Sequence, residues 1–474
     1  MTETLTPDLC IIGAGSAGLS IAAGAQQMGA DCVLIERHRM GGDCLNYGCV
    51  PSKALLAASK AARCGASAKK YGVDYQAPQV DFRRVHDHVQ GVIAGIAPMD
   101  SVERFEELGV RVLQGEGRFS DPRTVQVNGT AVNARRFVLA TGSSAFVPPI
   151  PGLDRTPYLT NETVFDLTEL PEHLIVVGGG PIGTELGQAF ARLGARVTIV
   201  EMGSLLPQDD PEMVDVLRQQ LRNDGIDLRE GAQVTQAAPE GNGVRVTLRR
   251  HDEEEGLRGS HLLIAAGRRP VLDGLGLEEA GIERKNGVLV LDRRLRTSNR
   301  RVFAAGDTAG GPMFTHVAGY HSGVVIKNAL FRLPAKVDHS AVPWVTYTSP
   351  EVSHVGMTES AARELHGEVE VLRWPFAEND RARSERQTDG LVKAVVGKRG
   401  HVLGCSIVGE HAGELLYPWI MAVQNKMKIG TIAQMIAPYP TLGEASKRAA
   451  GTYYTPKLFS NRTRRIVRFL ARFG

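Results

Sequence analysis

Cys44 and Cys49 are the residues whose type and spacing most directly indicate chemistry in this chain. They lie in the segment GGDCLNYGCVPSK, residues 41–53, which leads into an apolar helical pattern. Two cysteines at this spacing occur as metal ligands, as inert packing or as a redox disulfide. Metal binding is disfavoured, because the sequence holds no second Cys/His cluster to complete a zinc site. A redox disulfide needs one sulfur beside an electron donor and the other open to substrate, and a short turn leading into a helix can provide both.

Two glycine-rich segments provide the elements that would position such an electron donor. Residues 9–18 read LCIIGAGSAG and residues 174–183 read LIVVGGGPIG, each an apolar strand pattern that runs into Gly-x-Gly-x-x-Gly. A second apolar strand then ends in a glutamate, Glu36 or Glu201, at the same offset from the first glycine. In such a βαβ unit the glycines let a pyrophosphate approach the helix N-terminus, and the carboxylate binds the ribose hydroxyls. The repeat therefore predicts two dinucleotide-binding units.

Glu201 also indicates which nucleotide the second unit binds. A carboxylate at this position repels a 2′-phosphate, and the residues after it, Met202, Gly203 and Ser204, supply no arginine to hold one. We therefore expect NADH rather than NADPH.

The composition excludes several classes of protein. The chain has 474 residues, of which 43% are hydrophobic and 23% charged, with six cysteines and a formal net charge of +3. These values exclude disorder, a collagen-like repeat and a secreted disulfide scaffold, and the length predicts two to four domains. Residues 456–474 hold six Lys and Arg and no acid, so the rest of the chain is net acidic, which argues against nucleic-acid binding. A glycine motif beginning at Gly13 leaves no room for a signal peptide, and no apolar stretch reaches about 20 residues, so we expect a cytoplasmic enzyme.

The patterns along the chain predict an α/β fold with two Rossmann-like dinucleotide-binding domains and a C-terminal α+β domain. Residues 54–112 have mostly helical patterns, whereas WVTYTSPEVSHVG, LVKAVVG and VLGCSIVG, all after residue 337, indicate β-strands. The predicted ranges are 1–149 for the first domain, 150–270 for the second, 271–336 for a return segment of the first, 337–455 for the C-terminal domain and 456–474 for a basic tail.

Segment 41–53 closely resembles the active-site motif of the class I pyridine nucleotide–disulfide oxidoreductases, the group of dihydrolipoamide dehydrogenase, glutathione reductase and mercuric reductase. The resemblance extends over essentially the whole chain. It implies FAD in the first unit, NADH or NADPH in the second, a homodimer, and a small-molecule or protein-bound disulfide or thiol as substrate. The residues that it assigns to cofactor binding are Gly13, Gly15, Ser16, Ala17, Gly18, Glu36, Arg37, Gly42, Asp43, Cys44, Lys53, Gly117, Ala140, Thr141, Gly142, Gly178, Gly180, Ile182, Gly183, Glu201, Gly267, Gly306 and Asp307.

The same resemblance assigns roles to the catalytic residues. Cys44 would be the interchange thiol that attacks the substrate, and Cys49 would be the thiol against the flavin. Lys53 resembles the lysine beside the flavin N5, and Glu185 resembles the glutamate that pairs with it. A lysine ammonium at that place favours the reduced, anionic flavin on charge grounds.

The sequence departs from the family pattern at a catalytic position near the C-terminus. Disulfide reductases of the family carry His-Pro-Thr with a glutamate five residues after the histidine, and the partner subunit uses this histidine as acid–base. Here Tyr439 replaces the histidine and Glu444 is kept. A tyrosine with a pKa of about 10 is a poor proton shuttle at neutral pH. His316 is a candidate replacement base, although packing is the commoner role of such a histidine.

Tyrosine at this place resembles mercuric reductase, but the C-terminal cysteine pair of that enzyme is missing, since Cys405 is the last cysteine. Asp43 stands where the family commonly has threonine, and Tyr47 where a small or aliphatic residue is usual. We expect transfer of electrons from NADH through FAD to the Cys44–Cys49 disulfide and on to a disulfide or another thiol-reactive acceptor. Dihydrolipoamide dehydrogenase activity is the alternative, and mercury(II) reduction comes third.

The tail predicts a basic amphipathic helix. Ile466, Phe469, Leu470 and Phe473 share one helical stripe, and arginines line another side. Such a helix would either lie on an anionic membrane surface, at the inner face of the membrane, or pack on the protein's own dimer. The first case gives a further alternative, a membrane-docked NADH:quinone reductase.

Overall fold

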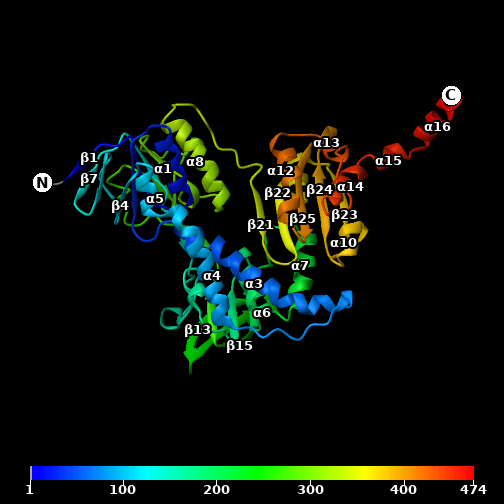
Figure 1. Ribbon diagram of the computed structural model, residues 1–474, viewed down its shortest axis with the longest axis horizontal. Helices are drawn as coiled ribbons and strands as arrows, with labels where there is room; N and C mark the ends of the chain where they lie inside the picture. Colours follow the sequence, from blue (N-terminus) through cyan, green and yellow to red (C-terminus); the bar gives the residue numbers. More distant parts are fainter. Residues whose placement is uncertain (1–2, 474) are drawn as a thin grey trace. The chain divides into compact units, whose positions relative to one another are not determined.

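The computed structural model describes residues 3–473, apart from the side chains of Ala66 and Ser67. Residues 1, 2 and 474, which the predicted ranges 1–149 and 456–474 include, lie outside the described part. The described chain forms two compact units, residues 3–202 with 231–339 and residues 203–230 with 340–473 (Figure 1).

The first unit contains a parallel sheet with the strand order β20-β8-β2-β3-β4. Its strands are β2 (Leu9–Ile12), β3 (Cys32–Glu36), β4 (Arg111–Gln114), β8 (Arg136–Leu139) and β20 (Val302–Ala304). Every residue of β2 is buried, as expected for a strand covered on both faces. Helices α1 (Ser16–Gln27) and α8 (Thr315–Ala329) pack against each other and share one apolar core with this sheet.

A second parallel sheet in the same unit has the order β11-β10-β16. Its strands are β10 (His173–Val177), β11 (Arg196–Glu201) and β16 (His261–Ile264), with α6 (Pro181–Leu193) between the first two. An antiparallel meander follows β11 along the chain and consists of β13 (Gln233–Glu240), β14 (Gly243–Arg250) and β15 (Glu253–Gly259). The two βαβ units confirm the α/β fold that the repeated glycine segments predict.

The remaining elements of the first unit connect these sheets. The helices are α2 (Gly42–Asn46), α3 (Cys49–Ala68), α4 (Phe82–Ile96) and α5 (Val102–Glu107). The short strands are β1 (Thr4–Leu5), β5 (Arg118–Asp121), β6 (Thr124–Val127), β7 (Thr130–Val132), β9 (Ser143–Ala145), β17 (Arg268–Pro270), β18 (Arg284–Lys285) and β19 (Val288–Leu289). Helix α3 packs on α6, and β9 pairs with β17, so segments far apart in the sequence meet near the cysteines.

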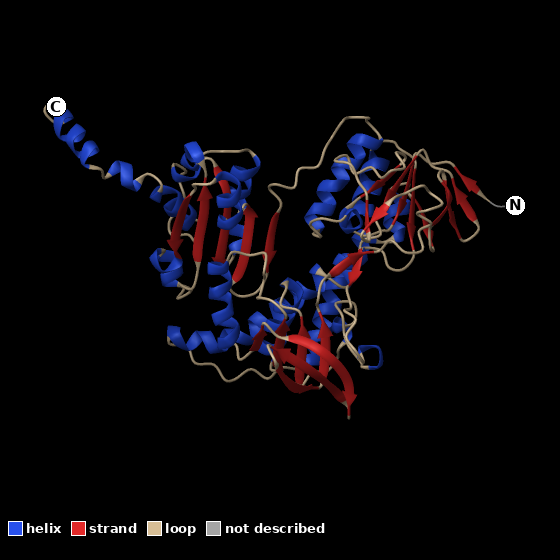
Figure 2. Ribbon diagram, turned by 180° about the vertical axis from the view of Figure 1, so that it is seen from behind, coloured by secondary structure: helices blue, strands red, loops and turns tan. Residues whose placement is uncertain are grey.

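The second unit is built on an antiparallel sheet with the order β21-β22-β25-β24-β23, whose strands lie side by side in Figure 2. The strands are β21 (Pro343–Thr346), β22 (Glu351–Gly356), β23 (Glu370–Pro375), β24 (Leu391–Val396) and β25 (Val402–Gly409). The helices after residue 340 are α9 (Glu359–His366), α10 (Asp380–Ser384), α11 (Ala412–Leu415), α12 (Tyr417–Gln424), α13 (Ile429–Ala433), α14 (Glu444–Thr452), α15 (Thr455–Leu458) and α16 (Asn461–Leu470). Trp419 and Phe376 are fully buried in the core between sheet and helices.

Residues 203–230 are grouped with this second unit, and the predicted range 150–270 stays a prediction. They contain α7 (Pro211–Asn223) and β12 (Asp227–Glu230), and α7 packs on β22 and β25. A buried ion cluster joins the start of α7 to β24. Lys393 Nζ on β24 lies 2.7 Å from Asp210 Oδ2 and 2.6 Å from Glu212 Oε1, and its side chain is 4% exposed. A contact between positions so distant in the sequence leaves no local pattern.

Among residues 3–473, no helix combines the length and apolar character that crossing a bilayer would require.

Candidate functional site

The two cysteines lie on either side of a tight turn. Cys44 is on the short helix α2, and Cys49 is the first residue of the 20-residue helix α3. Both are free thiols, Cys44 half-buried and Cys49 exposed. The Cys44 thiol is hydrogen-bonded to the Cys49 sulfur, and Thr315 Oγ1, at the start of α8, lies 3.5 Å from Cys49 Sγ. The turn therefore holds the two sulfurs as a directly interacting pair.

The environment makes the two thiols electrostatically unequal. The hydrogen bond from Cys44, with smaller contributions from Thr315 and the Lys53 ammonium, lowers the pKa of Cys49 from its ordinary value of 9.0 to about 6. The same bond, together with burial, raises the pKa of Cys44. Cys49 also sits at a helix N-terminus, where the backbone N–H groups favour an anion. These contacts therefore favour a protonated Cys44 that donates to an ionised Cys49.

Lys53 and Glu185 form an ion pair that joins α3 to α6. Lys53 Nζ lies 2.8 Å from Glu185 Oε2, and the glutamate side chain is 6% exposed whereas the lysine is 37% exposed. Lys53 lies one helical turn after Cys49, so its ammonium is on the side of the thiolate. The pairing that the family resemblance implies is present, and the roles of the two residues stay predictions.

The two glycine segments have the same geometry. A Cβ on Gly13 would lie 2.3 Å from the Ala140 carbonyl oxygen, and a Cβ on Gly178 would lie 2.3 Å from that of Ala265. Both residues have positive φ, +108° and +116°, so the backbone conformation excludes a side chain as well as the crowding does. The fifth residue after each is equally crowded, since a Cβ on Gly18 would lie 1.8 Å from the Gly13 oxygen.

The glutamates at the ends of β3 and β11 accept hydrogen bonds from the glycine loops that precede them along the chain. Glu36 Oε2 accepts the Ala14 N–H at 2.7 Å, and Glu201 Oε2 accepts the Gly179 N–H at 2.7 Å. Helices α1 and α6 begin at glycine caps that form no side-chain capping bond, and a Cβ on Gly180 would meet no atom within 4 Å. Each helix therefore presents backbone N–H groups beside open space and a carboxylate. These residues fit the pyrophosphate and ribose of FAD in the first unit and of a nicotinamide dinucleotide in the second.

Asp307 is joined to the cysteine turn by a chain of polar contacts, here called the Asp43–Asp307 network. Ser143 Oγ donates to Asp307 Oδ2 at 2.5 Å, and Arg268 Nε donates to Ser143 Oγ at 2.8 Å. Arg268 Nη2 then lies 3.0 Å from Asp43 Oδ1, and Asn161 Nδ2 donates to the same oxygen at 3.0 Å. Burial raises the pKa of Asp307. The network consists of Asp43, Asn161, Arg268, Ser143 and Asp307.

Tyr439 and Glu444 lie in the second unit. Tyr439 is 68% exposed and its hydroxyl donates to Asp380 Oδ2 at 3.1 Å, which raises the pKa of the tyrosine. Glu444 is the first residue of α14 and pairs with Arg448 at 2.7 Å. The tyrosine is therefore a still weaker proton donor than its ordinary pKa indicates.

The other predicted site residues lie at strand ends and loops of the first unit. Gly42 packs against Gly15, where an added Cβ would lie 2.7 Å from the Gly15 Cα, so the cysteine segment touches the first glycine loop. Gly117 packs on Ile35 at the end of β3, and Gly267 directly precedes β17. Arg37 directly follows Glu36 at the end of β3, and Ile182 is in the first turn of α6.

Sequence reasoning missed Thr315, Arg268, Ser143 and Asn161. Thr315 contacts Cys49 from 266 positions away. The sequence feature that could have located it is the short separation along the chain between the Gly306-Asp307 motif and the start of α8. His316, a candidate base, stacks on Phe314 with ring centroids 5.2 Å apart. Within the described residues, no group of three or more His, Cys, Asp or Glu could hold a metal ion.

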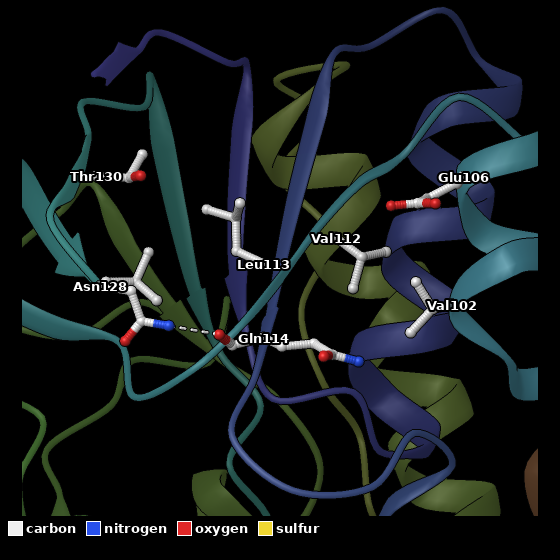
Figure 3. A pocket seen from close by; sticks show the side chains of 8 residues that line it. Val102, Glu106, Val112, Leu113, Gln114, Asn128 and Thr130 are labelled. Atoms are coloured by element: carbon white, nitrogen blue, oxygen red, sulfur yellow. Dashed lines mark hydrogen bonds between the residues drawn. The ribbon is translucent and has the colours of Figure 1, made fainter.

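A separate cavity of about 310 Å³ lies at the edge strand β4 of the first sheet (Figure 3). Val102, Glu106, Val112 and Gln114 line it, and Asn128 Nδ2 donates to the Gln114 carbonyl at 2.7 Å. It contains none of the predicted site residues.

Comparison with known proteins decides the family. Residues 7–322 match the family model for pyridine nucleotide-disulphide oxidoreductase, and residues 342–450 match its dimerisation domain. The chain belongs to the pyridine nucleotide–disulfide oxidoreductases. It is 36% identical to a mercuric reductase of Bacillus cereus over 94% of this chain and 71% of that protein. It is 36% identical to a dihydrolipoyl dehydrogenase of Haloferax volcanii over 94% of this chain and 95% of that protein.

A solved structure shares the fold. The Cu(II) complex of the HOCl-induced flavoprotein disulfide reductase RclA from Escherichia coli superposes with a TM-score of 0.84 at 29% identity, covering 93% of this chain and 98% of that one. The family uses FAD and NAD(P)H, and the chain is an NAD(P)H-dependent flavoprotein disulfide oxidoreductase. The match to the dimerisation domain supports a homodimer.

Proposed function

We propose that this oxidoreductase uses NADH to maintain Cys44 and Cys49 as a thiol–thiolate pair, and that Cys44 attacks an acceptor whose reduction needs no histidine relay. The observation that carries the proposal is the geometry of the pair, two adjoining sulfurs with Thr315 Oγ1 3.5 Å from Cys49 Sγ and the Lys53–Glu185 ion pair one helical turn away, which favours the thiolate on Cys49. Tyr439 supports the restriction on the acceptor, because its hydroxyl is exposed and its pKa is raised by Asp380.

The reductive half-reaction balances on the two sulfurs. Bound FAD would supply a two-electron path from the nicotinamide hydride to the Cys44–Cys49 disulfide. One hydride equivalent added to a disulfide breaks the S–S bond and gives one thiol and one thiolate. No further proton is needed to reach the state in which Cys44 is protonated and Cys49 is ionised. Lys53, 2.8 Å from Glu185, would balance the added negative charge on this side of α3.

The oxidative half-reaction would start at Cys44, since the interchange thiol must reach the acceptor. Cys44 would first pass its proton to the Cys49 thiolate across their hydrogen bond, and would then attack as the thiolate. A disulfide, a persulfide or a soft metal ion can each accept two electrons from the pair and restore the Cys44–Cys49 bond. Lipoamide is disfavoured, because release of its dithiol requires a proton that Tyr439 donates poorly. Mercury(II), which takes up two electrons to give mercury(0), is a candidate because the relatives include mercuric reductases. Copper(II) is a second candidate because a structural neighbour is a Cu(II) complex, and two copper(II) ions, each reduced to copper(I), would take up the two electrons. Thiolate ligands bind such soft ions well.

The test is anaerobic NADH oxidation by the flavin-loaded dimer with lipoamide, mercury(II) or an alkyl disulfide as acceptor. We expect turnover with mercury(II) to exceed turnover with lipoamide and with the alkyl disulfide by at least tenfold, because both disulfides release thiols that need protons, and we expect it to be lost in Cys44→Ser. Cys64→Ser is the matched control, because Cys64 is an exposed cysteine on the same helix as Cys49. Fast lipoamide turnover would overturn the proposal and make the chain a divergent lipoamide enzyme.

The preference for NADH rests on Glu201. Its carboxylate is fixed 2.7 Å from the Gly179 N–H, where the adenosine ribose of the nucleotide would bind, and the exposed Met202 follows it. A 2′-phosphate would face this carboxylate with no arginine among the next three residues. NADPH should therefore show a kcat/KM at least tenfold below that of NADH.

We also propose that the tail binds an anionic membrane surface. Helix α16 has no buried residue, and the exposed fraction of its apolar residues runs from 48% at Ile466 to 59% at Val467. Six cations and no acid lie in residues 456–474, so the charge complements anionic lipid. The basic cluster consists of Lys457, Arg462, Arg464, Arg465, Arg468 and Arg472.

Co-sedimentation with phosphatidylglycerol vesicles tests the tail. The full chain should sediment at least tenfold more than a chain that ends at Pro456, and less in high salt. Equal sedimentation of the two chains would overturn the proposal. If the tail instead holds the dimer together, the full chain will dissociate into monomers at a lower protein concentration than the shortened chain, in the absence of vesicles. Quinone turnover that survives Cys44→Ser would favour the NADH:quinone reductase alternative.

A further inference from the structure

The Asp43–Asp307 network connects the two halves of the site that the reaction must keep aligned. Asp43 immediately precedes Cys44, and Asp307 is the carboxylate assigned to the flavin side. Between them, Arg268 Nε donates to Ser143 Oγ at 2.8 Å and Arg268 Nη2 donates to the Ser143 carbonyl at 2.9 Å. The arginine side chain is 13% exposed, so its contacts are shielded from water. Planar guanidinium groups hold such forked contacts in a fixed geometry.

The same carboxylate also closes the turn between the cysteines. Asn161, which is 5% exposed, donates from Nδ2 to Asp43 Oδ1 at 3.0 Å and to the Tyr47 carbonyl at 3.2 Å. The Asp43 carbonyl in turn accepts the Tyr47 N–H at 2.8 Å. A Cβ on Gly48 would lie 2.9 Å from Asp43 Oδ2, so the carboxylate rests against the residue before Cys49. Asp43 therefore contacts both ends of the turn that sets the distance between the sulfurs.

A threonine, which the family commonly has at this place, has no charge for Arg268 and no second oxygen for the turn. Arg268 would then keep Ser143 as its partner in the network and lose its carboxylate. We propose that Asp43 is a positioning residue of this chain, which acts through Arg268 and Asn161 to hold the Cys44–Cys49 turn against the Asp307 loop while the disulfide opens and closes. The inference rests on the proposed function of the two cysteines.

Positioning by Asp43 has a measurable consequence at Cys49. The largest cause that lowers the pKa of Cys49 is the hydrogen bond from Cys44, and this bond requires the turn to keep its shape. A loosened turn weakens the bond and raises the pKa of Cys49. In Asp43→Asn the amide can still accept the Asn161 bond, but the ion pair with Arg268 is lost.

The experiment uses the flavin-loaded dimer reduced anaerobically with NADH. Two readouts are followed against pH. The first is the long-wavelength thiolate-to-flavin absorbance of this dimer, and the second is the rate at which iodoacetamide alkylates Cys49 in reduced protein from which FAD has been removed, identified by peptide mass spectrometry. For the absorbance we compare only protein that is fully loaded with FAD, and we expect Asp43→Asn and Asp43→Thr to move both pH midpoints upward by at least one unit, a tenfold change in thiolate equilibrium. Asp252→Asn, an exposed carboxylate in the β14–β15 turn, is the matched control and should move neither.

The double variant Asp43→Asn/Arg268→Met tests the route. If Asp43 acts through Arg268, the pH midpoint of the double variant will equal that of Arg268→Met alone. Shifts of the two single variants that add in the double variant would overturn the inference. Unchanged or lowered midpoints in Asp43→Asn would also overturn it. A wild-type protein that gives no thiolate-to-flavin band contradicts the proposed function instead, and the alkylation midpoints then still decide whether Asp43 positions the turn.

Discussion

The unequal thiols predict the outcome of one substitution, Cys44→Ala. This change removes the hydrogen bond that contributes most to the low pKa of Cys49 and leaves Thr315 and Lys53 in place. The helix N-terminus also stays. We therefore expect the pKa of Cys49 to rise from about 6 most of the way toward its ordinary value of 9.0.

The size of the effect follows from the two pKa values. At pH 7 a thiol with a pKa of about 6 is about 90% thiolate, and one with a pKa of 9.0 is about 1% thiolate. A pKa of about 8 in the variant would leave about 10% thiolate, so alkylation at pH 7 would be about tenfold slower. The alkylation rate must rise with pH in both proteins, because the thiolate fraction of Cys49 rises as pH rises through its pKa.

The assay is the pH dependence of iodoacetamide alkylation of Cys49, followed by peptide mass spectrometry in protein reduced before labelling. Cys64 is also exposed, so its peptide is followed separately and its midpoint should not differ between the two proteins. Cys10, Cys32 and Cys405 are buried and should label slowly. A Cys49 midpoint that stays near pH 6 in Cys44→Ala would refute the argument that the neighbouring thiol lowers this pKa.

Three further predictions concern other parts of the molecule. Lys393→Met should lower the free energy of unfolding by about 3–5 kcal/mol in urea titrations, because it leaves the buried Asp210 without its cation; an unchanged midpoint would contradict a stabilising ion cluster. Tyr439→His should raise lipoamide turnover at pH 7 by about 10²-fold or more in steady-state assays, since a histidine titrates in this range, and equal turnover would show that the tyrosine does not limit it. Glu201→Ser combined with Met202→Arg should raise the NADPH to NADH ratio of kcat/KM at least tenfold, and a ratio that stays low would mean that these residues do not face the 2′ position.

Local patterns were enough to predict the nucleotide-binding units. The last glycine of each fingerprint is required by crowding against the first, as a Cβ on Gly18 would lie 1.8 Å from the Gly13 oxygen and one on Gly183 would lie 2.0 Å from the Gly178 oxygen, so this requirement is visible within a short run of residues. The cysteine turn is equally local, since Cys44 and Cys49 are five positions apart. The pairing of Lys53 with Glu185 came from the family resemblance, because helices α3 and α6 meet only after folding.

The partners of Asp43 could not be predicted in this way. Arg268 follows Asp43 by 225 positions and reaches it through the pairing of β9 with β17, two strands of three residues each. Strands this short carry almost no periodic signal. The attachment of α7 to the C-terminal sheet depends on Lys393, a charged residue in a strand that the hydrophobic pattern alone marks as buried. Long-range polar contacts of this kind follow from the fold and not from a motif.

The hydrogen-bonded sulfurs also determine how the enzyme responds to peroxide. A thiolate is the form of cysteine that hydrogen peroxide oxidises, and the lowered pKa of Cys49 favours its thiolate. The product, a sulfenic acid on Cys49, would be in contact with the Cys44 thiol, which attacks it, releases water and forms the disulfide. That disulfide is the state in which the catalytic cycle begins. Oxidative damage at the most reactive atom of the molecule is therefore converted into a turnover intermediate, at the expense of one NADH, before the irreversible sulfinic acid can form.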